Sequence, residues 1–156
     1  MRHRIRGAAV VVHEGRLLLA LHGDAAHGPM YWSPPGGGAE GEEDLFASAV
    51  RETEEETSLR VVAERPLYVQ ELVNYRRRTR TLELFVLCRL ADGVEPGELR
   101  AAHEITESRL VSRQEIARLN VLPDIFAGVF WDDLAAGFPT FRHLGLKIIR
   151  EGRASS

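Results

Sequence analysis

The stretch that decides the fold is GGAEGEEDLFASAVRETEEETSL, residues 37–59. It begins among three consecutive glycines that follow two prolines, a composition that excludes helix and central strand and indicates a special backbone path. Asp44 is a good N-cap residue, and the residues after it predict a helix that runs to about Thr57. A glycine-rich loop therefore leads directly into an acidic helix.

The predicted helix has two chemically different faces. A helical wheel groups the residues that should pack on a sheet: Phe46, Val50, Thr53 and Thr57. It places three glutamates in a separate stripe on the far side: Glu52, Glu55 and Glu56. Carboxylates within one turn repel one another, and a hard cation such as Mg²⁺ removes that repulsion. For an isolated cluster, a solvated acidic face is the alternative interpretation.

The spacing of this stretch resembles the signature of the Nudix hydrolase family, G-x5-E-x7-R-E-U-x-E-E-x-G-U, in which U is a bulky aliphatic residue. The most diagnostic positions all match: Gly37, Glu43, Arg51, Glu52, Glu55 and Glu56. Two positions depart, because Thr53 replaces an aliphatic residue and Ser58 replaces the closing glycine. A glycine at position 58 would ease a left-handed C-cap. Neither departure changes a charged group.

The resemblance implies both a fold and a reaction. Members have an α/β/α sandwich with a mixed central β-sheet flanked by helices. They use Mg²⁺ or Mn²⁺ to hydrolyse a small-molecule nucleoside diphosphate linked to another moiety, such as a nucleoside triphosphate, a dinucleoside polyphosphate or a nucleotide sugar. A catalytically silent nucleotide-sensing or scaffold domain with the same fold is the alternative function. Many relatives are dimers, so a homodimer is compatible with the resemblance.

The resemblance also assigns roles to individual residues. The implied metal ligands are the Gly37 carbonyl and the carboxylates of Glu52, Glu55 and Glu56, and these glutamates are also catalytic candidates. The general base is Glu104, Glu107 or Glu52, in that order of preference. Arg51 and Glu43 have structural roles, because the arginine can orient a glutamate or contact the loop.

The rest of the chain predicts a mixed sheet flanked by helices. Two apolar runs joined by a glycine-containing turn predict a β-hairpin, over residues 8–12 and 17–21. Further strands are predicted over residues 59–62, 67–75, 81–90 and 104–111. Ser112 and Glu115 form a capping box that opens a helix to about residue 120, and Asp124 is expected to cap a helix over residues 125–135.

The hairpin tip between two of the predicted strands is rich in arginine. It carries Arg76, Arg77, Arg78 and Arg80. Arginines there could bind substrate phosphates, whereas the alternative is a solvated tip whose charges discourage edge pairing. The candidate substrate contacts are Tyr75, Arg78, Arg80 and Glu107. A tyrosine near position 75 occurs in some dinucleoside polyphosphate hydrolases of the family.

Composition limits the remaining alternatives. The 156 residues predict one domain over residues 1–150 with a frayed tail at 151–156. A single cysteine makes no internal disulfide, which agrees with a reducing cytoplasm. A net charge of −3 gives no general case for nucleic acid, and no apolar run reaches the roughly 20 residues that span a membrane. A cytoplasmic protein with neither partner is therefore expected, although residues 40–56 hold eight acidic residues against one arginine.

Overall fold

A computed structural model of the chain describes residues 1–23, 28–97 and 107–150. The strands are β1 (Arg2–His13), β2 (Arg16–His22), β3 (Tyr31–Ser33), β4 (Gly36–Gly38), β5 (Val61–Asn74), β6 (Thr79–Leu90), β7 (Ser108–Val111) and β8 (Arg142–Ile149). The helical elements are α1 (Leu45–Thr57), α2 (Arg113–Ile116), the 3-10 helix η2 (Asp124–Ala127) and α3 (Val129–Ala135). The main path of the sheet is β3-β2-β1-β6-β5-β8, with β4 added to β1 and β7 added to β2. The sheet is mixed, because β1–β6 and β5–β8 are parallel pairs.

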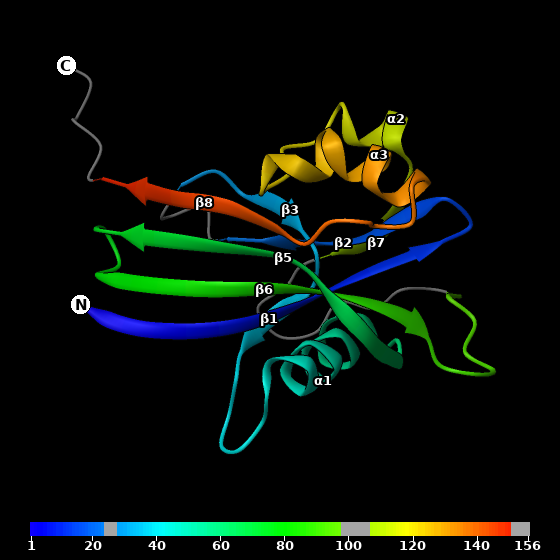
Figure 1. Cartoon of the computed structure of the whole chain (residues 1–156), viewed down its shortest axis with the longest axis horizontal. Coiled ribbons are helices and arrows are strands. Elements are labelled where there is room, and N and C mark those ends of the chain that lie inside the picture. Colours follow the sequence, from blue (N-terminus) through cyan, green and yellow to red (C-terminus); the bar gives the residue numbers. More distant parts are fainter. Residues whose placement is uncertain (24–27, 98–106, 151–156) are drawn as a thin grey trace.

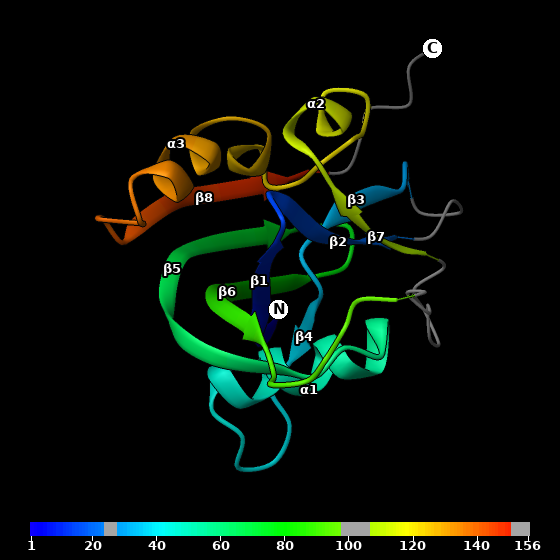
Figure 2. The ribbon, with the colours of Figure 1, turned by 90° about the vertical axis from the view of Figure 1, so that its right-hand side faces the viewer.

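Helices cover both faces of the sheet, as the sequence predicts for an α/β/α sandwich (Figures 1 and 2). We call the side covered by η2 and α3 the α3 face, and the side covered by α1 the α1 face. Aromatic residues dominate the core on the α3 face, among them Tyr68, Phe85, Phe126 and Phe130. Smaller residues such as Ala49, Val86 and Cys88 form the core on the α1 face. The helix with the glutamates therefore packs on a thin layer of small side chains.

The predicted N-terminal hairpin is confirmed, and β1 and β2 are both longer than the apolar runs that predicted them. The region predicted as two strands, 59–62 and 67–75, is the single strand β5. Pro66 cannot donate a backbone hydrogen bond to a ladder, and β5 accommodates it with register shifts on either side of residues 65 and 66. An irregular strand was therefore misread as two.

The C-terminal third differs most from the sequence prediction. The capping box of Ser112 and Glu115 is present, but α2 ends at Ile116. Asp124 does not cap a long helix: it begins η2, and Gly128 separates η2 from α3. Strand β8 was not predicted at all, although Leu144, Leu146 and Ile148 alternate with other side chains along it. It lies at the edge of the sheet beside β5, so both of its faces are partly exposed.

One end of the sheet projects beyond the helices on both faces. This end contains the start of β1, the β5–β6 turn and the end of β8 (Figure 1). Within the described part of the chain, the helices are too short or too polar to cross a membrane.

Candidate active site

The glycine-rich strand β4 brings the backbone close to α1. The Gly36 N–H donates a hydrogen bond to Glu56 Oε2 at 3.2 Å. A Cβ atom on Gly37 would overlap the Glu52 carboxylate, and one on Gly7 of β1 would overlap the Leu45 carbonyl at the start of α1. Glycines at these positions therefore let the helix approach the sheet without intervening side chains.

This close approach changes which face of α1 is buried. The buried residues of the helix are Ser48, Ala49, Thr53, Glu56 and Thr57. Glu56 is only 8% exposed, so the prediction of a glutamate stripe on the far side of the helix is wrong for this residue. The helical wheel treated the sheet as an apolar surface, but glycines oppose this part of α1 and leave room for a carboxylate.

Glu56 and Glu52 repel each other at the junction of α1 and β4. Burial raises the pKa of the Glu56 carboxyl well above its usual range, and the nearby Glu52 charge raises it further. The hydrogen bond from Gly36 and the charge of Arg6 oppose this shift without cancelling it. Burial and the Glu52 charge therefore disfavour the ionised form of Glu56, and a cation bound beside it would favour that form.

Arg51 organises the remaining carboxylates of the signature. Its guanidinium makes a bidentate pair with Glu43 at 2.8 and 2.9 Å, and it contacts Glu52 at 3.0 Å and Glu55 at 3.2 Å. It also donates to the Gly38 carbonyl at 3.2 Å. Hydrogen bonds from Arg51 and from the Glu40 N–H hold the pKa of Glu43 below its usual range. These contacts support the structural roles expected for the arginine and Glu43.

Both departures from the signature are accommodated by α1. The Thr53 hydroxyl is fully buried and donates to the Ala49 carbonyl at 2.7 Å, so the hydroxyl is satisfied. Ser58 adopts the left-handed conformation, with φ of 63°, and its N–H donates to the Glu54 carbonyl at 2.8 Å. At the other end, Asp44 caps the helix as predicted by accepting from the Ala47 N–H.

A polar row beside the signature was not foreseen. Arg6, Glu83 and Gln70 lie side by side on β1, β6 and β5, on the α3 face. Arg6 pairs with Glu83 at 2.9 Å and donates to the Gly36 carbonyl at 3.2 Å, while Gln70 donates to Glu83 at 3.0 Å. Arg2, Arg4 and Arg6 recur at every second residue of β1, and this alternation was the sequence signal available for a polar row on one face of the strand. The row links the sheet to the loop that contacts Glu56.

His22 and Tyr31 lie beside this row. Their rings stack with centroids 5.6 Å apart. Burial and the Arg6 charge lower the pKa of His22 to about 4, so its imidazole is neutral at pH 7. Within the described residues, His22 Nε2 and Gln70 Oε1 are buried without a hydrogen-bond partner. These atoms are available acceptors near the signature.

The structure brings together only some of the predicted site residues. Glu52 lies against Gly37, and Glu56 accepts a hydrogen bond from the Gly36 N–H. Glu55 contacts the same Arg51 guanidinium as Glu52. Arg80 lies on the α1 face and pairs with Glu71 at 3.0 Å, away from the polar row. Arg78 has a left-handed backbone in the β5–β6 turn.

Two further predicted residues lie apart from the glutamates. Tyr75 is 45% exposed and has the Arg150 guanidinium 5.4 Å from its ring centre. Glu107 precedes β7, and its carboxylate pairs with Arg109 at 2.8 Å. Glu104, the first choice for the general base, lies outside the described residues.

The donors at the junction fit a hard divalent cation. In residues 1–23, 28–97 and 107–150, no three His, Cys, Asp or Glu side chains converge as a metal-binding group. Glu52 and Glu55 instead contact Arg51. Carboxylate and backbone carbonyl oxygens are nevertheless the ligands that Mg²⁺ takes, and the unneutralised charge on Glu56 and Glu52 favours a cation. Glycine at position 37 lets the Glu52 carboxylate lie directly against the β4 backbone.

Fold and site together define a mixed-sheet α/β protein with an acidic helix held against a glycine-rich strand. The sequence matches the NUDIX domain over residues 1–128. The chain therefore belongs to the NUDIX family of hydrolases. No curated protein matches the sequence closely enough to count as a relative.

Solved structures with similar folds include several members of this family. A NUDIX hydrolase from Nitrosomonas europaea is 23% identical, with a TM-score of 0.72 over 97% of this chain and 81% of that one. A MutT protein from Methanosarcina mazei is 20% identical, with a TM-score of 0.66 over 89% and 97%. An ADP-ribose pyrophosphatase from Streptococcus suis is 23% identical, with a TM-score of 0.58 over 92% and 98%. Because these sequence identities are between 20% and 23%, the similarity to these solved structures shows a shared fold.

Proposed function

We propose that this protein hydrolyses a diphosphate bond in a nucleoside diphosphate linked to another moiety, with Mg²⁺ or Mn²⁺ as cofactor. The observation that carries the proposal is the buried Glu56 carboxyl, whose ionisation Glu52 opposes, beside a glycine that lets the Glu52 carboxylate lie against β4. A structural acidic face would be exposed, whereas Glu56 is buried. Burial of an unneutralised carboxylate costs stability, and a function that needs the charge explains its presence.

The residues proposed to hold the cation are Glu52, Glu55, Glu56 and the Gly37 carbonyl. A bound divalent cation would neutralise charge on the diphosphate and lower the pKa of a water molecule. The neighbouring residues have positioning roles. Arg51 orients Glu52 and Glu55 through its hydrogen bonds, and Arg6 holds the Gly36 carbonyl while its charge opposes the repulsion at Glu56.

For the general base we keep three candidates and rank them by their surroundings. Glu52 is next to Glu56 and is 17% exposed, so it can reach a water at the junction. Glu107 pairs with Arg109, which makes it the weaker candidate. Glu104 remains the choice implied by the resemblance. A base must be within hydrogen-bond reach of the water from which it takes a proton.

The substrate class is proposed as a nucleoside triphosphate, a dinucleoside polyphosphate or a nucleotide sugar. Among the proteins of similar fold, one is named an ADP-ribose pyrophosphatase and another a UDP-X diphosphatase. Both names describe a nucleoside diphosphate with a further group attached. Tyr75, Arg78 and Arg80 are kept as candidate substrate contacts, and for Arg80 the proposal is weakened by its ion pair with Glu71.

The experiment is a substrate panel assayed for phosphate or nucleotide release with Mg²⁺ and Mn²⁺. We expect the wild type to turn over at least one nucleoside diphosphate derivative, and Glu56→Gln to lose at least about 100-fold in kcat/KM. Glu54→Gln is the matched control, because Glu54 is an exposed glutamate on the same helix. It should retain activity within about threefold.

A silent nucleotide-sensing or scaffold domain is the competing function. It predicts that no compound in the panel is hydrolysed, while nucleotide still raises the melting temperature of the protein. Equal activity of Glu56→Gln and the wild type would contradict the proposed role of the junction.

A further inference from the structure

The uncovered end of the sheet gathers cations that are far apart in the sequence. Arg4, Thr81, Leu72 and Lys147 are register partners in one row across β1, β6, β5 and β8. Paired residues in a sheet point to the same side, so Arg4 and Lys147 share a face. Arg2 lies two residues further out on β1 and therefore on that face too.

This basic row lies on the same face as the polar row of Arg6, Glu83 and Gln70. Arg4 is two residues from Arg6, so the two side chains point the same way and start roughly 7 Å apart along the strand. Arg6 contacts the Gly36 carbonyl, and the Gly36 N–H contacts Glu56. The row therefore continues outward from the junction of α1 and β4.

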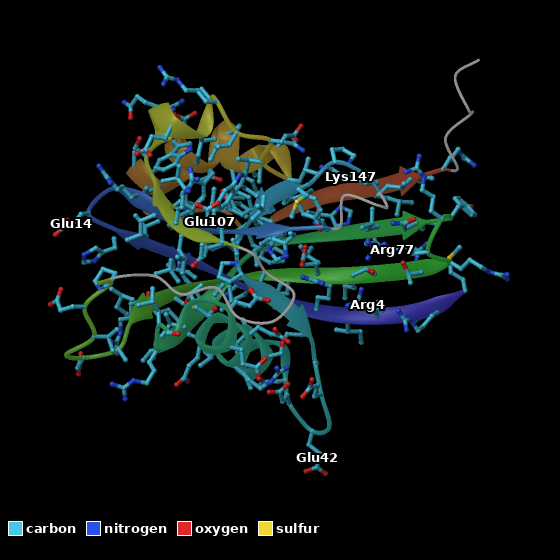
Figure 3. All side chains as sticks on the ribbon, turned by 180° about the vertical axis from the view of Figure 1, so that it is seen from behind. Arg4, Glu14, Glu42, Arg77, Glu107 and Lys147 are labelled. Carbon is cyan, nitrogen blue, oxygen red and sulfur yellow. The ribbon has the colours of Figure 1, made fainter. Side chains whose placement is uncertain are left out.

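Arg77 of the β5–β6 turn approaches the same surface. The Arg2 N–H donates to the Arg78 carbonyl at 2.8 Å, so the start of β1 lies against this turn. Burial and the positive charges of Arg6, Arg2 and Arg77 lower the pKa of Arg4, in agreement with this arrangement. Figure 3 shows Arg4, Arg77 and Lys147 at one end of the molecule. We call Arg2, Arg4, Arg77 and Lys147 the basic sheet end.

The basic sheet end gathers four cations without a counterion in the described part of the chain, in contrast to four arginines elsewhere in the fold. Arg6, Arg51, Arg80 and Arg142 each pair with a carboxylate at 3.0 Å or less. Within the described residues, the charged groups of these four side chains make no hydrogen bond or ion pair, and Arg77 uses only its backbone N–H, which donates to Asn74 Oδ1 at 3.1 Å. Unpaired cations held together in a folded protein attract a polyanion.

An aromatic ring lies among these cations. Burial and the Glu83 charge raise the pKa of the Tyr31 hydroxyl, and the positive charges of Arg6, Arg77 and Arg4 oppose this shift. Tyr31 is partly exposed and stacks on His22. Cations that follow a backbone, together with a ring on which a base can stack, are the features that bind single-stranded nucleic acid. A duplex would keep its bases away from the ring.

A membrane surface fits these positions less well. Three exposed aliphatic side chains of this end, Ile5, Leu82 and Leu146, fall in a row with Glu71 and so lie on the α1 face. Ile149, two residues beyond Lys147, is an exposed aliphatic residue on the same face as the cations. The cations lie on the α3 face. A membrane-docking surface presents its apolar and basic residues together, whereas Ile5, Leu82 and Leu146 lie on the opposite face from the cations.

From this arrangement we infer that the basic sheet end binds the phosphate backbone of single-stranded nucleic acid, with Tyr31 stacking on a base. This interaction goes beyond the proposed hydrolysis and does not depend on it. It departs from the expectation based on net charge, since a total of −3 averages the acidic helix with a basic surface built from residues 2, 4, 77 and 147.

The test is fluorescence anisotropy with a labelled oligouridylate of about twelve nucleotides, in EDTA so that no hydrolysis occurs. We expect the full chain to bind it with an affinity that falls steeply with salt. The triple variant Arg4→Gln, Arg77→Gln, Lys147→Gln should bind at least about tenfold more weakly. Its salt slope should be smaller by roughly 2, because a single strand loses about 0.7 per phosphate contact.

A second triple variant controls for net charge. Arg60, Arg113 and Arg118 are exposed and lie away from the basic sheet end, so changing all three to Gln removes the same charge elsewhere. This control should bind within about twofold of the wild type. Circular dichroism checks that both triple variants fold. If the variant of Arg4, Arg77 and Lys147 does not fold, the single variant Lys147→Gln replaces it, and this variant should bind the oligonucleotide about twofold more weakly than the wild type.

Three results would overturn the inference. The first is no binding of the oligonucleotide by the wild type at low salt. The second is an equal loss in the two triple variants, which would mean attraction by net charge alone. The third is tighter binding to a duplex of the same length or to vesicles rich in phosphatidylserine, which would assign the surface to another partner.

Discussion

The two arginine–carboxylate clusters on opposite faces of the sheet differ in how their charges are matched. On the α3 face, Asp133 accepts two hydrogen bonds from Arg142 and one from Tyr68, all at 2.8 Å. On the α1 face, Arg51 is shared among several glutamates, and Glu56 receives only a backbone N–H. The first cluster is complete in itself, whereas the second carries excess negative charge.

This difference separates a structural site from a functional one. A buried carboxylate with all of its partners present stabilises the fold, because its removal leaves other buried groups unpaired. A buried carboxylate beside another carboxylate costs stability until a ligand compensates it. Substitutions in the two clusters should therefore have opposite effects on stability and activity.

The largest change in stability is expected at the complete cluster. Asp133→Asn should lower the free energy of unfolding by about 2–3 kcal/mol, because Arg142 and Tyr68 lose a buried acceptor. Urea denaturation measures this change. Asp132→Asn is the control, since the neighbouring aspartate is exposed, and it should stay within about 0.5 kcal/mol of the wild type.

The same variant has a defined pH dependence. Arg142 and Tyr68 lower the pKa of Asp133 below its ordinary value of 3.8. The stabilisation is therefore present above that value and is lost as the pH falls through the pKa of the folded protein. The stability gap between the wild type and Asp133→Asn should narrow below about pH 4. A gap that stays constant down to pH 2 would contradict the cluster's charge pairing.

At the open cluster, the next largest effect should be on activity. Gly37→Ala introduces a Cβ atom where the Glu52 carboxylate lies, so kcat/KM should fall roughly 10–100-fold. Gly38→Ala is a matched control in the same strand, because its Cβ would have no neighbour closer than the Ile5 carbonyl oxygen at 3.9 Å. Equal losses in both variants would show that the strand, rather than the Glu52 position, was disturbed.

Glu56→Gln should stabilise the metal-free protein while it removes activity. Burial and Glu52 raise the pKa of Glu56 above its ordinary value of 4.5, so the native carboxyl costs stability once the pH exceeds that value. The gain from glutamine should be on the order of 1 kcal/mol at pH 7 and should vanish below about pH 4. Thermal denaturation in EDTA measures it. If Glu56→Gln were less stable than the wild type at pH 7, the carboxyl of Glu56 would not cost stability, and the account of this cluster would be contradicted.

The smallest effect is expected at the end of α1. Ser58 has a φ of 63°, a conformation that glycine adopts without strain. Ser58→Gly should therefore raise the free energy of unfolding by about 0.5 kcal/mol and leave activity unchanged. Thermal denaturation at matched concentration detects the change. A loss of stability would mean that the serine hydroxyl contributes more than the strain costs.

Local sequence signals predicted the signature region well. The N-cap at Asp44, the helix to Thr57 and the N-terminal hairpin depend on neighbouring residues, so the sequence reveals them. The burial of Glu56 was missed because it depends on glycines that a helical wheel does not include. Gly7 reaches α1 only through sheet pairing.

Features built by distant residues could not be predicted from spacing. The hydrogen bond between Tyr68 and Asp133 connects positions that are 65 residues apart. The basic sheet end is built from residues at the start of β1 and at the end of β8. The β5 bulges and the early end of α2 were missed for a different reason. Local propensity indicates the type of an element, but tertiary packing determines where that element bends or ends.

The central claim is that Glu56 and Glu52 form a cation site at the junction of α1 and β4. The most direct test is the melting temperature of the wild type, Glu56→Gln and Glu54→Gln with increasing Mg²⁺ or Mn²⁺. Saturation at 100 times the dissociation constant should stabilise the wild type and Glu54→Gln by about 2.7 kcal/mol, and Glu56→Gln by far less. Equal stabilisation of all three proteins, or none in the wild type with either metal, would contradict the account.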